Sequence, residues 1–150
     1  MKELKVTAIK DGTVIDHIPA SSTFKVVSIL NLEQHPEVVM LATNLHSKKL
    51  EKKGLIKVGG KIITSKEANA IAIIAPQATV NIIKDYKVVQ KIFLSAPDEL
   101  ENLITCSNPE CISNNYEMKT LFKVISKKPL VVRCNYCERV MQDGEILIKS

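Results

Sequence analysis

Apolar residues alternate with polar ones, or recur at helical spacing, along the first two thirds of this 150-residue chain. Alternation predicts strands, and a spacing of three to four residues predicts helices. Strands are predicted at residues 4–8, 13–19, 37–44, 55–58 with 61–64, 79–83 and 87–93. Helices are predicted from Ser21 or Ser22 to about Leu32, and from an N-cap at Ser65 to a stop near Pro76. This order, with one added strand, is typical of a ferredoxin-like sheet.

Such a sheet carries its helices on one face and leaves the other face for a ligand or a partner. We expect Phe24, Val27 and Leu30, with Ile29, to form the apolar face of the first helix. The strand at 37–44 is apolar enough to be buried. Residues 46–54 are rich in lysine and are interpreted as a charged, solvated connection.

A change of pattern at Ser95-Ala-Pro-Asp98 indicates a linker, because proline and small residues interrupt the apolar periodicity there. We therefore expect two domains, residues 1–97 and residues 98–150. The second contains four short predicted strands at about 103–105, 120–125, 130–133 and 145–149. A domain of about 50 residues buries too little apolar surface to be comfortably stable alone.

All four cysteines lie in this second domain, as Cys106-Ser-Asn-Pro-Glu-Cys111 and Cys134-Asn-Tyr-Cys137. Each pair has the spacing of a metal knuckle, in which a tight turn directs two thiolates to one ion. We interpret the set as one structural Zn²⁺ per chain, with no open position for catalysis. The predicted fold class is thus α+β: a ferredoxin-like sheet with two helices, followed by a small all-β zinc domain.

Three other interpretations of the cysteines stay open at this point. Two disulfides would need an oxidising compartment, but the chain begins without an apolar signal sequence. Redox chemistry at Cys134 and Cys137 would leave Cys106 and Cys111 without a role. An iron centre of the rubredoxin kind has the same ligands, and spacing does not fully separate the metals.

The positive charge is concentrated in the first domain. Residues 1–97 carry a net charge of +6, and residues 98–150 carry −1. A basic first domain suits anionic ligands, whereas the second has no general attraction for nucleic acid. No apolar segment approaches the roughly 20 residues of a membrane span, so we expect a soluble, cytoplasmic protein.

Catalytic chemistry is not evident from the residues. The adjacent Asp16 and His17 could form an acid–base pair, but neighbouring strand residues point to opposite faces. No nucleophile with a base and no open metal site can be assembled. On chemistry alone, the chain is predicted to be a binding protein and not an enzyme.

Three motifs and the cysteine knuckles carry a resemblance to a known family. The motifs are Gly12-Thr-Val-Ile-Asp-His-Ile-Pro-Ala20, Leu55-Ile-Lys57 and Ala75-Pro-Gln-Ala-Thr-Val-Asn81. In this order they closely resemble the regulatory chain of aspartate carbamoyltransferase, over essentially the whole chain. The resemblance implies a non-catalytic subunit with a nucleotide-binding domain and a zinc domain, acting in pyrimidine biosynthesis.

The resemblance also implies a nucleotide site in the first domain. The base would lie near Ile9, Val14 and Tyr86, with backbone groups of Ile9 and Tyr86 reading its exocyclic amine. Asp16 and Lys57 would contact the ribose or base. The triphosphate would be surrounded by His17, Asn81, Val88 and Lys91. The implied effectors are CTP, which inhibits, ATP, which opposes it, and UTP, which assists CTP.

The implied partners are proteins. Regulatory chains of this family pair as homodimers through their nucleotide domains, and their zinc domains contact the catalytic chain in a larger hetero-oligomer. We expect Asn108, Glu110, Tyr136 and Glu138, on the knuckles, to make that contact. The loop Leu45-His-Ser-Lys-Lys-Leu-Glu-Lys-Lys departs from the family pattern, which argues against a second nucleotide site.

A rival function from another class is nucleic-acid binding through the zinc domain, using Lys127, Lys128, Arg133 and Arg139. The net negative charge of residues 98–150 and the scarcity of aromatic residues for stacking bases argue against it.

Overall fold

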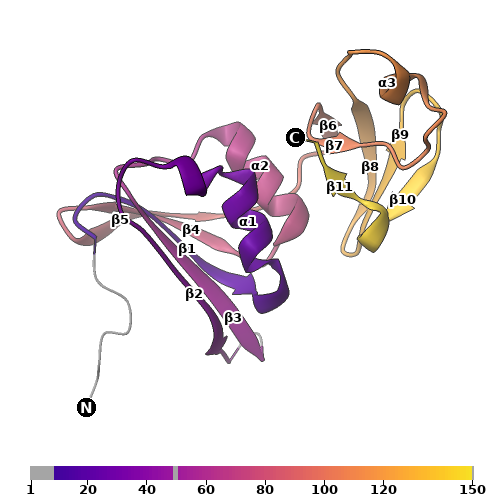
Figure 1. Cartoon of the computed structure of the whole chain (residues 1–150). Coiled ribbons are helices and arrows are strands. Elements are labelled where there is room, and N and C mark those ends of the chain that lie inside the picture. Colours follow the sequence, from indigo (N-terminus) through magenta and orange to yellow (C-terminus); the bar gives the residue numbers. More distant parts are fainter. Residues whose placement is uncertain (1–8, 49–50, 150) are drawn as a thin grey trace. The chain divides into compact units, whose positions relative to one another are not determined.

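An antiparallel sheet with both helices on one face builds the chain up to Ser95 (Figure 1). The computed structural model describes residues 9–48 and 51–149. In spatial order the strands are β2 (Val39–His46), β3 (Lys52–Gly59), β1 (Gly12–Pro19), β4 (Thr79–Lys84) and β5 (Lys87–Phe93). The helices are α1 (Thr23–Ile29) and α2 (Ser65–Ile74). The predicted ferredoxin-like sheet with one added strand is therefore confirmed.

Alternation along the central strands separates the core from the uncovered face. Ile15 lies opposite Ile56 on β3 and opposite Val80 on β4, and all three are buried beneath the helices. The residues beside them in sequence point the other way, because successive strand residues face opposite sides. We call this second side, which carries Val14, Lys57, Asn81 and Lys91, the open face.

The first helix is shorter and oriented differently than predicted. A 3-10 turn, η1 (Ala20–Ser22), precedes α1, and Asn31 adopts a left-handed φ of 52° soon after its end. A second 3-10 turn, η2 (Leu32–Gln34), replaces the last predicted turn. The inward face is formed by Thr23, Val26 and Leu30, so the placement of Phe24 in the core was wrong: its side chain is 63% exposed.

Three further expectations for the first unit were wrong. The strand predicted to be buried at 37–44 is the edge strand β2, whose residues are half-buried or exposed because only β3 pairs with it. The charged connection is shorter than 46–54, because Lys52 and Lys53 already belong to β3. Residues 61–64 form no strand and lead directly into α2.

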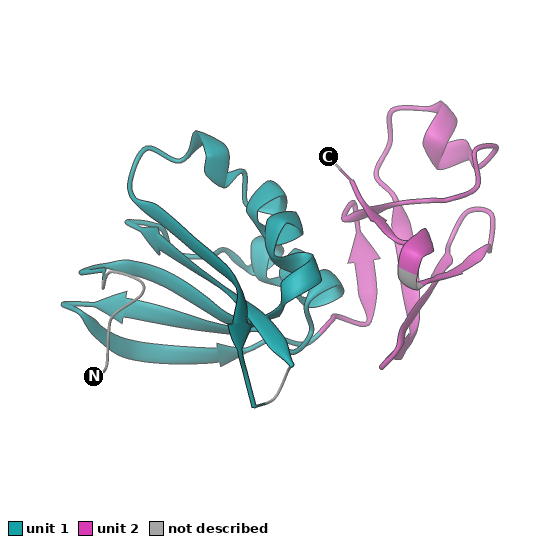
Figure 2. Cartoon of the chain, turned by 60° about the horizontal axis from the view of Figure 1, so that its bottom comes forward, with its two compact units in different colours: residues 1–95 teal, residues 96–150 magenta. Residues whose placement is uncertain are grey.

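The chain divides after Ser95, two residues before the predicted boundary (Figure 2). The second unit has a sheet with the order β10-β9-β8-β6 and a separate pair of β7 and β11. Its strands are β6 (Glu99–Glu101), β7 (Ile104–Thr105), β8 (Leu121–Lys127), β9 (Leu130–Cys134), β10 (Val140–Gln142) and β11 (Leu147–Ile148). Sequence analysis missed β6 and β10, each only three residues long, and two single turns, α3 (Ile112–Asn115) and η3 (Asp143–Glu145).

Some predictions fall outside the described residues, namely the strand at 4–8 and Lys49 of the lysine-rich segment. Within residues 9–48 and 51–149, no helix has the length and apolar character needed to cross a membrane.

The start of α2 is set by a capping box at Thr64, one residue before the predicted N-cap. The Thr64 hydroxyl accepts the Glu67 N–H at 3.2 Å, and the Glu67 carboxylate accepts the Thr64 N–H at 3.0 Å. Burial raises the pKa of Glu67, but the hydrogen bonds from Thr64 and the Lys61 ammonium at 3.1 Å outweigh burial and leave it lowered.

We predict that Thr64→Ala lowers the free energy of unfolding of the first unit by about 1 kcal/mol at pH 7, because a cap hydroxyl is lost. The Glu67 pKa is lower in the folded state than in the unfolded state. Its contribution is therefore present at neutral pH and is lost as the pH falls through the folded pKa. Urea unfolding at pH 7 and pH 3 checks both points. Ser65→Ala is the matched control, and an equal loss from Ser65→Ala would contradict the assignment of the cap.

Candidate functional site

A row of predicted site residues crosses the open face in register. Lys57 on β3 lies opposite Val14 on β1, Val14 lies opposite Asn81 on β4, and Asn81 lies opposite Lys91 on β5. Directly opposite residues of antiparallel strands present their side chains on the same face, a few ångströms apart. Four positions that are distant in sequence thus meet as one stripe with a lysine at each end.

A bulge in β1 brings Asp16 and His17 to the same side. The pairing of β1 with β3 shifts register between Ile15 and Ile18, and His17 has a φ of 58°. Asp16 lies opposite Thr79, and the His17 Nδ1 is 3.2 Å from the Thr79 Oγ1. The expectation that adjacent strand residues face opposite sides therefore fails here, because a left-handed residue at a bulge re-aims its side chain.

The turn between β4 and β5 places Tyr86 beside the segment that contains Ile9. Asp85 and Tyr86 both have positive φ, at 50° and 65°, as a two-residue hairpin turn of type I′ requires. The Tyr86 N–H donates to the Lys10 carbonyl at 2.9 Å, and the Asp85 N–H donates to the Asp11 carboxylate at 3.2 Å. Val88 follows on β5, opposite Ile83, with its side chain exposed.

Sequence analysis missed Lys53 as a member of this face. Its ammonium is 2.8 Å from the Asp16 carboxylate, and both side chains are largely shielded from solvent. Lys53, Leu55 and Lys57 alternate along β3, so strand periodicity could have placed Lys53 beside Lys57. Burial raises the pKa of Asp16, but the bonds from Lys53 and from the His17 N–H outweigh it and leave the pKa lowered.

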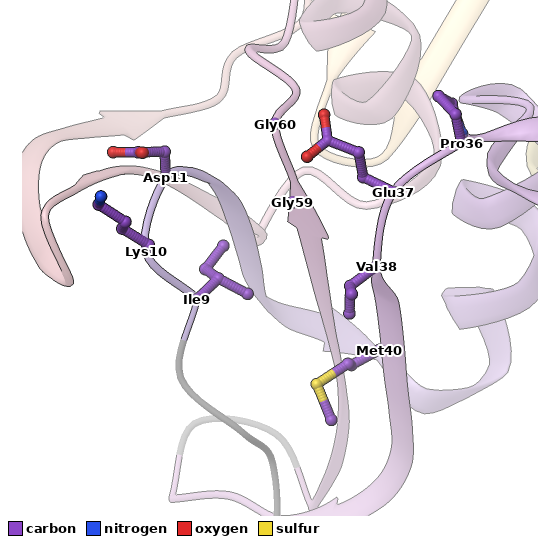
Figure 3. A pocket seen from close by; sticks show the side chains of 9 residues that line it. All are labelled: Ile9, Lys10, Asp11, Pro36, Glu37, Val38, Met40, Gly59 and Gly60. Carbon is purple, nitrogen blue, oxygen red and sulfur yellow. The ribbon is translucent and has the colours of Figure 1, made fainter.

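A cavity of about 810 Å³ lies next to this face but has a different character (Figure 3). It is lined by apolar side chains, two carboxylates and one ammonium group, at Ile9, Lys10, Asp11, Pro36, Glu37, Val38, Met40, Gly59 and Gly60. The Glu37 carboxylate lies against Gly60, which has a φ of 70° and no room for a Cβ. Of the residues predicted to bind a nucleotide, only Ile9 lines the cavity, and two carboxylates beside a single lysine make it a poor site for phosphates.

The four cysteine sulfurs converge in the second unit, each within 4.8 Å of the others. Cys106 and Cys137 approach to 3.6 Å, and Cys111 and Cys134 approach to 3.7 Å. In a tetrahedral thiolate site with zinc–sulfur bonds near 2.3 Å, sulfurs lie about 3.8 Å apart. All four are free cysteines, so the two-disulfide interpretation was wrong. The redox interpretation loses its basis, because Cys106 and Cys111 share the site with Cys134 and Cys137.

Local hydrogen bonds shape both knuckles. The Asn114 amide donates to the Cys106 and Asn108 carbonyls at 2.9 and 2.7 Å, and the Asn115 amide donates to the Cys111 carbonyl at 2.9 Å. In the second knuckle the Glu138 N–H donates to the Cys134 carbonyl at 2.9 Å. Sequence analysis missed both asparagines, although short polar side chains after a knuckle are a recognisable sign of such bonds.

The four thiols can all ionise together only beside a cation. Burial raises the pKa of the Cys106 thiol to about 12, and the sulfurs of Cys137 and Cys134 add to the effect of burial. Burial also raises the pKa of Cys134. Burial acts similarly on Cys137, but hydrogen bonds from the Arg139 N–H and the Asn108 side chain outweigh it and lower its pKa to about 7. Four thiolates at this spacing would repel one another, so their joint ionisation needs a bound metal ion.

The four predicted interface residues lie on the knuckles but differ in their surroundings. Asn108 accepts the Glu110 N–H at 3.0 Å, and the Tyr136 hydroxyl donates to the Lys119 carbonyl at 3.1 Å. Both side chains thus stabilise the domain itself. The Glu110 and Glu138 side chains are exposed.

The basic residues of the rival nucleic-acid interpretation do not form one cluster. Lys127 and Lys128 lie at the hairpin between β8 and β9, and Lys127 pairs with Asp98 at 3.2 Å. Arg139 lies at the opposite end of β9, where it donates to the Ser107 hydroxyl at 3.4 Å. Lys127 and Lys128 therefore lie apart from Arg139, and Arg133 lies between them on β9, opposite Lys123.

The fold and the two sites define a class: a two-domain binding protein with a polar sheet face in one domain and a closed four-cysteine metal centre in the other. Two family models match the chain: aspartate carbamoyltransferase regulatory chain, allosteric domain, over residues 4–95, and the metal binding domain of the same chain, over residues 98–147.

Similar chains span the same length. The chain is 52% identical over 148 residues to the aspartate carbamoyltransferase regulatory chain of Thermococcus onnurineus, covering 98% of each. It is 53% identical over 149 residues to that of Pyrococcus abyssi, again covering 98% of each. For Parabacteroides distasonis the identity is 47% over 148 residues, covering 99% of this chain and 96% of the relative. The chain belongs to the family of aspartate carbamoyltransferase regulatory chains, which are non-catalytic subunits, and its second domain binds a structural metal.

We predict that Lys53 holds the Asp16 pKa down. Lys53→Met should raise the Asp16 pKa toward 3.8, because the ion pair and its hydrogen bond are lost. Carbon-detected NMR titration of the Asp16 carboxyl measures this directly. Lys52→Met is the matched control, since its exposed side chain is one residue away on the other side of β3. Equal pKa changes in the two variants would contradict the assignment.

Proposed function

We propose that this chain is the allosteric subunit that carries nucleoside triphosphate signals to the catalytic chain of aspartate carbamoyltransferase, in the cytoplasm. The observation that carries the proposal is the stripe of Lys57, Val14, Asn81 and Lys91 across the open face of a domain that matches the family's allosteric domain. Two ammonium groups and an amide in register suit a polyphosphate, because charge-assisted hydrogen bonds to phosphate are among the strong ones.

The base and ribose have candidate partners at neighbouring positions. Ile9 and Tyr86 are brought together by the bond from the Tyr86 N–H to the Lys10 carbonyl. An exocyclic amine is a hydrogen-bond donor, so the carbonyls of Ile9 and Tyr86 are the groups proposed to read it. Val14 supplies apolar surface for the base, and Asp16 and Lys57 are proposed to contact the ribose or base. His17 is proposed to join Asn81, Val88 and Lys91 around the triphosphate.

CTP and ATP are proposed as effectors, with UTP assisting CTP. An effector shifts a two-state assembly only if it binds the two states with different affinities, and coupling of about 1–3 kcal/mol is typical. The single stripe of lysines supports one nucleotide site per chain. Two lysines of the lysine-rich segment, Lys52 and Lys53, belong to β3, and Lys53 is paired with Asp16.

The metal is proposed to be Zn²⁺, held by Cys106, Cys111, Cys134 and Cys137. Four cysteines in a closed tetrahedral set are typical of structural zinc, which supplies folding energy and leaves no site for substrate. Iron has the same ligands available and is the alternative that metal analysis would reveal. The proposed domains are residues 1–97 for nucleotide binding and residues 98–150 for contact with the catalytic chain, through Asn108, Glu110, Tyr136 and Glu138.

Pairing of two regulatory chains is proposed to use the first domain. Its edge strand β2 reads Val-Met-Leu-Ala-Thr-Asn-Leu-His, without lysine or proline. Natural sheets usually protect exposed edges with such residues, since an uncharged edge can pair with another strand. The opposite edge strand, β5, contains Lys87 and Lys91 and is protected in that way.

A crossed pair of variants tests the proposal with the full chain and a catalytic chain of the same enzyme. Lys91→Ala should weaken CTP and ATP about equally, by roughly tenfold, because it removes a contact with phosphate and not with the base. It should leave assembly intact. Cys134→Ala should abolish metal binding and assembly but spare nucleotide binding, because the two units have separate cores.

The measurements are isothermal titration for the nucleotides, native mass spectrometry for assembly and carbamoyl transfer with and without CTP or ATP. Lys84→Ala, at the exposed end of β4, is the matched control for Lys91→Ala. Loss of nucleotide binding in Cys134→Ala, or unchanged triphosphate affinity in Lys91→Ala, would contradict the proposed division of roles. Wild-type protein that assembles unchanged after its metal is removed would also contradict it.

A further inference from the structure

The hydrogen bonds to the four cysteine sulfurs come from two kinds of donor. Cys106 accepts the Asn108 N–H at 3.5 Å. Cys134 accepts the N–H groups of Tyr136 and Cys137, and Cys137 accepts the Arg139 N–H and a bond from the half-buried Asn108 side chain. A divalent ion with four thiolates carries a net charge of −2, so donors of this kind stabilise the complex. A substitution by any residue except proline leaves a backbone donor in place, so these bonds are hard to test one at a time.

Cys111 is the sulfur whose hydrogen bond involves a buried side chain. It is the N-cap residue of α3, yet its side chain accepts no backbone N–H from that turn. Its sulfur lies 3.1 Å from the Ser113 hydroxyl instead. Both residues are buried, at 2% and 7% exposure. A metal-bound thiolate has no proton to donate, so the hydroxyl must be the donor once the metal is bound.

The position of Ser113 does not depend on its own hydroxyl. The turn that carries it is held by the Asn114 amide, which donates to two carbonyls of the first knuckle, and by the Asn115 amide, which donates to the Cys111 and Pro109 carbonyls. The backbone at residue 113 is therefore held by the side chains of the two residues that follow it. The hydroxyl can be deleted while the turn keeps its shape, which makes its contribution measurable.

We propose that Ser113 is a positioning residue of the metal centre. Its hydroxyl donates to the Cys111 thiolate, orients that ligand, and reduces the negative charge that the ion must balance. The consequence is tighter retention of the metal and a less nucleophilic Cys111. This inference rests on the metal centre of the proposed function and extends it to the residue that supports one particular ligand.

The test compares full-length Ser113→Ala with wild-type protein and uses zinc itself as the probe. Competition with a chromogenic chelator should show a zinc affinity about tenfold lower in Ser113→Ala, the lower end of the range for residues that support metal ligands. With Co²⁺ in place of zinc, the sulfur-to-metal charge-transfer band should move to longer wavelength, because an unbonded thiolate gives up charge more easily. Alkylation of Cys111 should also become faster.

Ser113→Thr keeps the hydroxyl and should resemble the wild type in affinity and in the charge-transfer band. Ser126→Ala is the control for removing a serine hydroxyl elsewhere in the same domain. Ser126 lies on β8 opposite Val131, four residues along the strand from Phe122, which is the residue that pairs with Cys134. Circular dichroism at saturating zinc verifies that each variant is folded.

Unchanged zinc affinity in Ser113→Ala would overturn the inference. So would a lower affinity without any shift of the charge-transfer band, which would mean that the side chain only fills space. Purified wild-type protein that binds no zinc would overturn the proposed metal centre together with this inference, whereas failure of Ser113→Ala alone leaves the metal centre standing.

Discussion

The second domain depends on the repulsion among four sulfur atoms and on the ion that offsets it. The sulfurs lie within 4.8 Å of one another at the junction of two knuckles, and burial raises the pKa of the Cys106 and Cys134 thiols. Without a cation the four thiols cannot all ionise, because neighbouring thiolates repel one another. With one, each becomes a ligand, and the knuckles from the two halves of a unit of 55 residues are tied at a single point. Short strands such as β6, β7, β10 and β11 then have a fixed frame on which to pair.

The first domain depends on a different constraint, the strict alternation of strands in an antiparallel sheet. Ile15, Ile56 and Val80 must face the helices for the core to form, and this forces Val14, Lys57 and Asn81 onto the other side. Apolar packing therefore positions the polar stripe, without any direct interaction between helix and stripe. The bulge at His17 is the one place in β1 where alternation is broken, and it adds a second ionisable side chain beside Asp16.

The metal site of the second domain and the strand alternation of the first domain are independent of each other. Each unit has its own core. The metal site lies in the second unit, and the lysines of the open face lie in the first. In the proposed function, a nucleotide on the open face therefore does not contact the metal centre within one unit. Its effect on a catalytic chain would have to pass from the first unit to the second.

Much of this protein could be predicted from local signals in its sequence. Cysteine spacing predicted the metal ligands, because a knuckle is a local turn. Periodicity predicted the strands of the first sheet and the α2 helix, and proline marked where α2 ends. Phe24 was misplaced because helical spacing does not reveal which stripe of α1 meets the sheet. The edge position of β2 was missed because strand order depends on contacts between distant segments.

The tertiary structure alone decided which residues meet. Lys53 and Asp16 are 37 positions apart, and only the pairing of β1 with β3 brings them to 2.8 Å. The left-handed His17 and the hydroxyl of Ser113 against the Cys111 sulfur have no signature in a single sequence. The sequence by itself determined the periodic elements and the ligands of the metal, since these follow from neighbours along the chain. Register and the bulge depend on the pairing of segments far apart in sequence, whereas the Ser113 hydroxyl is only two residues from Cys111 and its direction becomes definite when the turn folds.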